Sequence, residues 1–134
     1  DGAAGTVYRQ AQSQAPWKGT LVIDNNNFSS RTGVVTELPP SITNNPVWTD
    51  NLSRVTFVIT NRALATVTSN LFVRDITVQS NSYLTLGVYT VTVNSVEHHL
   101  DNLSHRGMGA TNQVDNYSHI LWVGLAPGSV IVIR

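Results

Sequence analysis

The sequence consists of short runs of β-branched and aromatic residues separated by Asn, Pro and Gly, and this pattern most constrains its fold. Such runs favour strands, whereas strong helix formers and apolar i, i+3, i+4 spacing are scarce. The one weak helical segment, residues 95–104, is equally well read as a loop. We therefore predict an all-β chain with strands over residues 5–9, 19–24, 54–61, 71–79, 83–86, 89–94, 119–124 and 129–134.

The strands are of two kinds. Residues 91–93 alternate as Val-Thr-Val, which is typical of a strand with one face in a core and one face in water. Residues 21–23 and the run Val130, Ile131, Val132 and Ile133 are continuously apolar. We expect these two runs to be buried on both faces, or to have one face covered by another molecule.

One internal repeat is visible. Residues 58–64 align with residues 78–84 at a displacement of 20 residues, which is about one coil of a parallel β-helix. In this alignment Asn61 matches Asn81 and Leu64 matches Leu84. Asn tolerates the left-handed backbone of a corner, so we expect both Asn residues to turn the chain and both Leu residues to return it to the core.

Two stretches carry a family resemblance. Residues 2–8, Gly-Ala-Ala-Gly-Thr-Val-Tyr, are followed by Gly-Thr-Leu-Val-Ile-Asp-Asn-Asn at residues 19–26. Together with residues 76–78 and 84–94, they resemble coils of secreted bacterial β-helix proteins, such as autotransporter passengers and related adhesins. The resemblance implies a right-handed parallel β-helix, export to the cell surface, and a role as stalk, adhesin or sheath.

The length of 134 residues fits a single all-β domain. The 20-residue displacement and the continuous apolar strands favour the right-handed parallel β-helix. Irregular strand spacing and the Pro- and Asn-rich segment 32–50 favour an antiparallel β-sandwich or jelly roll, and both folds stay open here. Because the chain begins with Asp rather than Met, we read it as a mature or trimmed piece of a longer exported precursor, or as a recombinant fragment.

The chain carries few charges. Eight basic and eight acidic residues balance, and charged residues make up 12% of the total, about half the usual quarter. A near-neutral surface gives no field to attract nucleic acid, and weak net charge favours association of copies. No apolar run is long enough to insert into a membrane, and the chain has no Cys.

Candidate catalytic and metal-binding groups are sparse. No acids recur at matched offsets and no nucleophile motif is present, so we predict that the chain is not an enzyme. His98, His99 and His105 form either a metal site or, as we favour, a polar loop. Four Asp-Asn pairs, beginning at residues 24, 50, 101 and 115, suit tight turns better than calcium. We therefore predict no metal and no cofactor, with calcium as the weaker alternative.

Aromatic residues divide by their surroundings. Phe57, Phe72 and Trp122 lie in apolar strands, so we expect them to fill the core. Trp17 and Trp48 lie close to Pro residues in predicted loops, and such exposed aromatic side chains stack on sugar rings or contact other subunits. We take these two Trp residues as candidate ligand contacts of a carbohydrate-binding or adhesin module.

The two ends of the chain suggest assembly. Neither terminal strand carries the Pro or central charge that usually prevents edge-to-edge pairing. We therefore predict strand addition between copies, giving a homopolymer that serves as a filament, sheath or stalk in an extracellular or cell-surface location. The predicted subunit contacts are Val7, Tyr8, Val130, Ile131, Val132 and Ile133.

Overall fold

The computed structural model describes residues 3–29, 34–38, 52–79, 81–94 and 114–123. Strands dominate these residues, which confirms the all-β prediction. Helical structure in the same residues is limited to two 3-10 turns, η1 (Leu52–Arg54) and η4 (Tyr117–His119). Across this part of the chain, no helix has the length and apolarity needed to cross a membrane. The predicted segments 95–104 and 129–134 lie outside the described residues.

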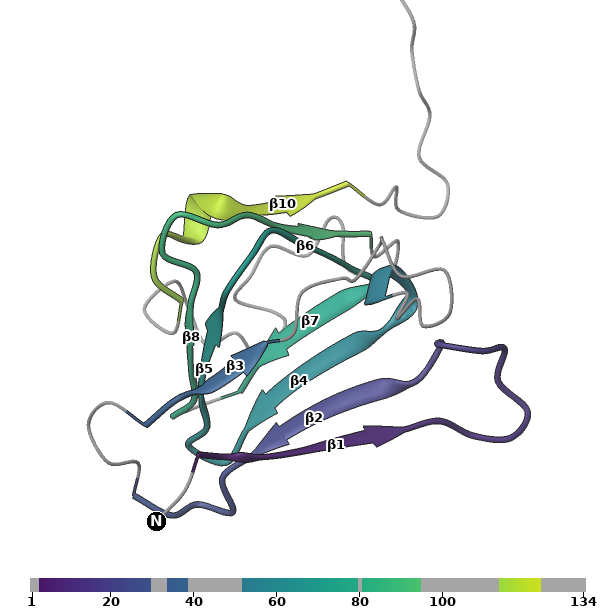
Figure 1. Ribbon diagram of the computed structural model, residues 1–134, viewed down its shortest axis with the longest axis horizontal. Helices are drawn as coiled ribbons and strands as arrows, with labels where there is room; N and C mark the ends of the chain where they lie inside the picture. Colours follow the sequence, from purple (N-terminus) through teal and green to yellow (C-terminus); the bar gives the residue numbers. More distant parts are fainter. Residues whose placement is uncertain (1–2, 30–33, 39–51, 80, 95–113, 124–134) are drawn as a thin grey trace, which may run out of the picture.

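The described strands form three open sheets (Figure 1). One sheet has four strands and the other two have three strands each. In spatial order, the first contains β1 (Gly5–Arg9), β2 (Thr20–Asp24), β4 (Thr56–Thr60) and β7 (Asp75–Val78), the second β3 (Thr36–Leu38), β5 (Leu64–Val67) and β8 (Tyr83–Thr85), and the third β10 (Ile120–Trp122), β9 (Val91–Val93) and β6 (Leu71–Val73).

Parallel pairing holds all three sheets together. The exception is β1, which runs antiparallel to β2 at the margin of the first sheet. From β4 to β9, consecutive strands belong to different sheets: β4, β5 and β6 each join a different one, and β7, β8 and β9 return to the sheets in the same order. Sandwiches and jelly rolls pair their strands antiparallel, so this connectivity does not match the alternative fold.

The internal repeat is present, but its predicted register was wrong by one residue. Ile59 pairs with Val78 and Leu64 with Tyr83, so the displacement between these strands is 19 residues. Asn81 therefore occupies the position equivalent to Arg62 rather than Asn61. All three residues have positive φ, at 63° for Asn81, 65° for Arg62 and 53° for Asn61, which confirms the left-handed corner.

Tertiary packing also moved several strand boundaries. The predicted strand over residues 71–79 is two strands in two sheets, because the chain turns at Arg74, whose N–H donates to the Val55 carbonyl at 3.0 Å. Strands β3 and β5 were not predicted. The return to the core after the corner uses Ala63, Ala65 and Val67, while Leu64 stays half-buried.

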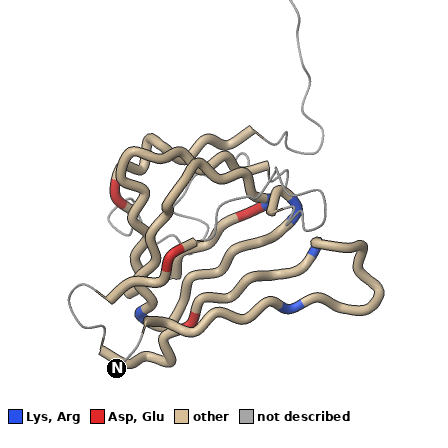
Figure 2. The backbone as a smooth tube through the Cα atoms, viewed as in Figure 1, with Lys and Arg blue, Asp and Glu red and all other residues tan. Residues whose placement is uncertain are grey.

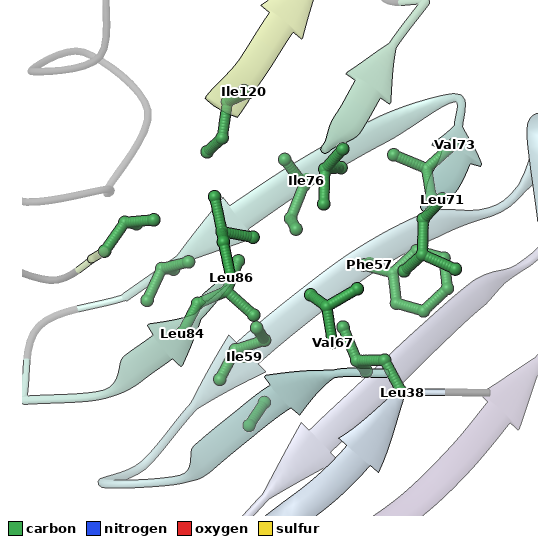
Figure 3. Packing of buried hydrophobic residues seen from close by; sticks show 14 of the residues in the cluster. Leu38, Phe57, Ile59, Val67, Leu71, Val73, Ile76, Leu84, Leu86 and Ile120 are labelled. Atoms are coloured by element: carbon green, nitrogen blue, oxygen red, sulfur yellow. The ribbon is translucent and has the colours of Figure 1, made fainter. Parts of the chain in front are cut away.

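A single apolar cluster fills the space between the sheets. Figure 3 shows side chains from all three sheets pointing into this common interior. Partner residues on neighbouring strands line up within it, as in the row Leu21–Phe57–Ile76. Its buried members are Ile23, Leu38, Leu52, Val55, Phe57, Ile59, Ala63, Ala65, Val67, Leu71, Val73, Ile76, Val78, Leu84, Leu86, Val91, Val93, Val114 and Ile120.

Candidate functional site

Strand β1 is the most exposed strand of the described fold. All five of its residues are exposed, and β2 is its one partner among the described strands (Figure 1). Of its two predicted contact residues, Val7 is 50% exposed and Tyr8 is 40% exposed. The other predicted subunit contacts, Val130, Ile131, Val132 and Ile133, lie outside the described residues.

Tyr8 also holds the β1–β2 connection in shape. Its hydroxyl accepts a hydrogen bond from the Gly19 N–H at 3.1 Å and donates one to Gln10 Oε1 at 2.8 Å. The Gln10 amide in turn donates to the Ala15 carbonyl at 3.1 Å, and the Ala11 N–H donates to Gln14 Oε1 at 2.9 Å. These bonds organise the loop that precedes β2, so Tyr8 has a structural role whether or not another molecule contacts it.

The outward face of the first sheet carries a row of valines. Ile23 is buried and Leu21 packs against the core, so Val22, between them, faces outward. Val22 pairs with Val7 on one side and with Val58 on the other. Val22 and Val58 are half-buried, whereas Val7 has no described neighbour beyond it and stays half exposed. The valine row therefore stops at the margin of the sheet.

On β1 and β2, the charged residues of this face lie at the ends of the strands. Arg9 pairs with Thr20 at one end, and Gly5 pairs with Asp24 at the other. Figure 2 shows blue and red positions scattered along the described backbone, without a long stretch of one sign. The middle of β1 is uncharged, so no side chain there repels an approaching strand.

The predicted tryptophan sites are not brought together by the described structure. Trp17 lies in the loop between β1 and β2, 39% exposed and with φ of 65°, and Trp48 lies outside the described residues.

The expectation for Phe72 was wrong: it is 44% exposed, while Phe57 is fully buried as predicted and Trp122 is half-buried. Its neighbours in a continuously apolar run gave no signal of which face it takes, because the alternation was set by packing of Leu71 and Val73.

Phe72 belongs to an outward row on the third sheet. It pairs with Thr92, and Leu121 occupies the same level on β10. Leu121 is 49% exposed and Thr92 is half-buried. An aromatic ring, a hydroxyl and an aliphatic side chain thus lie in one row on the outward face of this sheet.

Two of the Asp-Asn pairs lie within the described residues, and both act in turns. The Asp24 carboxylate accepts from the Asn26 N–H at 2.6 Å and from Asn61 Nδ2 at 2.9 Å. The Asp115 carboxylate accepts from the N–H groups of Leu86 and Gly87. All of these donors come from the chain itself, as expected for carboxylates that fix turns.

The other candidate polar groups lie in different parts of the described fold. Asp75 is buried and accepts from the Ile76 N–H at 2.9 Å, whereas the neighbouring Arg74 is exposed. His119 Nδ1 lies 3.1 Å from the Tyr89 carbonyl oxygen. Within the described ranges no group of three potential metal ligands occurs. His98, His99 and His105 lie outside those ranges.

The Asp24 turn makes stability depend on pH. The Asn26 and Asn61 donors, and the more distant charge of Arg9, hold the pKa of the Asp24 carboxyl below its ordinary value of 3.8, against the opposing effect of burial. A lowered pKa means that the ionised carboxylate stabilises the folded chain. This contribution is complete above pH 3.8 and is lost as pH falls through the lower folded value.

We therefore expect Asp24→Asn to lower the free energy of unfolding at pH 7 by at most about 1 kcal/mol, since solvent screens this site. The difference from the unsubstituted protein should narrow at pH 3. Urea unfolding at both pH values measures it. If the two proteins differed in free energy of unfolding by the same amount at pH 7 and pH 3, the carboxylate charge would contribute nothing to stability.

Comparisons with known proteins returned no relative for this architecture. No protein-family model matches the chain, and neither the curated proteins nor the solved structures contain a match to it.

Proposed function

We propose that this chain is a non-catalytic structural subunit of an extracellular or cell-surface assembly, and that copies associate through strand β1. The carrying observation is the exposure of β1. On its outer side, β1 has no partner among the described strands. Its central residues are uncharged, and its Val7 is half exposed. Such a strand edge is a template for adding another strand.

The scaffold that we propose is a short, right-handed parallel β-helix, like the secreted bacterial proteins that residues 2–8 and 19–26 resemble. Its support is the order in which consecutive strands visit the three sheets, with β4, β5 and β6 followed by β7, β8 and β9. Parallel neighbours at displacements of 19 residues (Thr56 to Asp75) and 20 residues (Leu71 to Val91) fit one coil per repeat.

A rod of stacked coils would place its function at its ends and faces. Each coil contacts its neighbours, and the end coils carry unpaired strand edges unless they are capped. Strand β1 covers the outer edge of β2, and its own outer edge has no partner among the described strands. This arrangement suits a subunit whose end is completed by another molecule.

Self-association can be tested with one side chain. We expect Val7→Lys to weaken association at least tenfold, because a charge at the centre of an edge strand opposes pairing. Val88→Lys is the matched control: Val88 is 82% exposed and lies in the turn between β8 and β9. Sedimentation velocity over a concentration series measures both. A protein that stays monomeric at every concentration would overturn the proposal.

A second candidate function is glycan binding, as in an adhesin, and it is favoured by the row Phe72–Thr92–Leu121. Aromatic rings with adjacent hydroxyl groups suit the apolar faces and hydroxyls of sugars. We expect this function to give specific hits on a glycan array that are lost in Phe72→Ala and kept in Trp17→Ala. An array without specific hits for the unsubstituted protein would exclude it.

A further inference from the structure

We propose that the partner of β1 is the β1 strand of a second copy, paired antiparallel about a two-fold axis at Val7. This inference rests on the proposed self-association and specifies its geometry. Val7 is the middle residue of Gly5–Arg9, so an axis there pairs the whole strand with its copy. Two four-stranded sheets then join into one continuous sheet across the axis.

The valine row selects this register. Within one copy, Val58, Val22 and Val7 lie side by side on the outward face. With the axis at Val7, the row continues directly into Val7, Val22 and Val58 of the second copy. Val22 and Val58 each have β-branched partners on both sides, and Val7 would gain its second one from the other copy. Cross-strand pairs of this kind stabilise sheets.

The charges select the antiparallel direction. In a parallel, in-register pair each Arg9 would lie about 4.8 Å from its copy, and like charges directly opposite destabilise a sheet. In the antiparallel pair the two Arg9 residues are four positions apart along the strands, about 13 Å. That separation exceeds the Debye length of about 8 Å at physiological salt.

The same arrangement gives each Arg9 a complementary charge. Arg9 of one copy lies opposite Gly5 of the other, and Gly5 is paired with Asp24 on the same face. Because Gly5 has no side chain, the arginine can extend over it toward the Asp24 carboxylate of the second copy. Two symmetric attractions of this kind occur per dimer, one on each side of the axis.

The predicted interface is small. Five residues from each copy bury much less than the roughly 1,200 Å² of a stable protein interface. We therefore expect a dimer in equilibrium with monomer, which weakens as salt screens the Arg9 and Asp24 charges.

Single cysteines can test this register because the chain has none of its own. Facing residues in an antiparallel pair have Cα atoms about 4.5–5.5 Å apart, within the range that a disulfide spans. We expect Val7→Cys to form disulfide-linked dimers on mild oxidation at least tenfold faster than Val88→Cys, which reports random collision. Arg9→Cys alone should not exceed that control.

A mixture of Gly5→Cys and Arg9→Cys chains gives the second arm of the test. It should form the mixed dimer, and a Cβ at Gly5 is tolerated because its nearest atom, the Asp24 carbonyl oxygen, lies 3.8 Å away. Efficient Arg9→Cys homodimers would indicate parallel pairing and overturn the inference. Association in sedimentation without the Val7 cross-link would also overturn it but leave the proposed assembly standing, whereas a persistent monomer would contradict both.

Discussion

Replacing Phe57 by Ala is expected to lower the free energy of unfolding by about 3–5 kcal/mol, the largest effect of a single substitution that we predict. Phe57 is fully buried and lies in the middle of the first sheet, between Leu21 on β2 and Ile76 on β7. Removal of the ring leaves a cavity that β4 cannot close by shifting, because its backbone is paired with β2 on one side and with β7 on the other.

Phe72 provides the matched control for this experiment. It is the same residue type, also on a strand with parallel partners, but 44% of its surface is exposed. We expect Phe72→Ala to cost about 1 kcal/mol or less, since nearly half of the side chain is already in contact with water. Urea unfolding followed by circular dichroism measures both variants. Equal losses would show that the two rings have similar surroundings and would contradict the described packing.

Replacing Gly19 by Val is expected to have the second largest effect, a loss of about 1–3 kcal/mol from overpacking. A Cβ at Gly19 would lie 2.4 Å from the Arg9 carbonyl oxygen and 2.6 Å from the ring carbon and the hydroxyl oxygen of Tyr8. The Arg9 oxygen is backbone, so relief requires the end of β1 to move away from β2. The Tyr8–Gly19 hydrogen bond would be lost in the process.

Gly5→Ala is the control for the Gly19 substitution. Gly5 lies at the other end of the same strand pair, and its added Cβ would meet only the Asp24 carbonyl oxygen, at 3.8 Å. We expect little change from it. Hydrogen exchange of the β1 and β2 amides, together with urea unfolding, separates local detachment of β1 from global destabilisation. Unchanged protection of these amides in the Gly19 variant would refute the predicted clash.

Most of the strands could be predicted from the sequence because their signals are local. The alternation Val91-Thr92-Val93 became buried, half-buried and buried, as its period of two requires. The corner asparagines were also readable, since Asn is the side chain that best tolerates positive φ after Gly. Strand β3 was missed because its three residues lie beside the Pro- and Asn-rich segment and give too short a pattern.

Other features depend on contacts between distant residues. Phe72 is flanked by apolar residues exactly as a core residue would be, yet it faces solvent because Leu71 and Val73 take the inward positions of a three-residue strand. The repeat was misaligned because Asn61 and Asn81 match in type, whereas the register is set by the pairing of Ile59 with Val78 and of Ala65 with Leu84.

The sequence by itself determined that this chain is all-β, weakly charged and turned by asparagine, because strand propensity, charge and backbone tolerance belong to individual residues and their neighbours. Only the tertiary structure decided which strands are parallel, which aromatic ring is buried, and that β1 lies at the margin of its sheet with Val7 at the end of a valine row. The physical reason is that pairing and burial are set by partners far away in the chain, such as residue 22 for Val7 and residue 76 for Phe57.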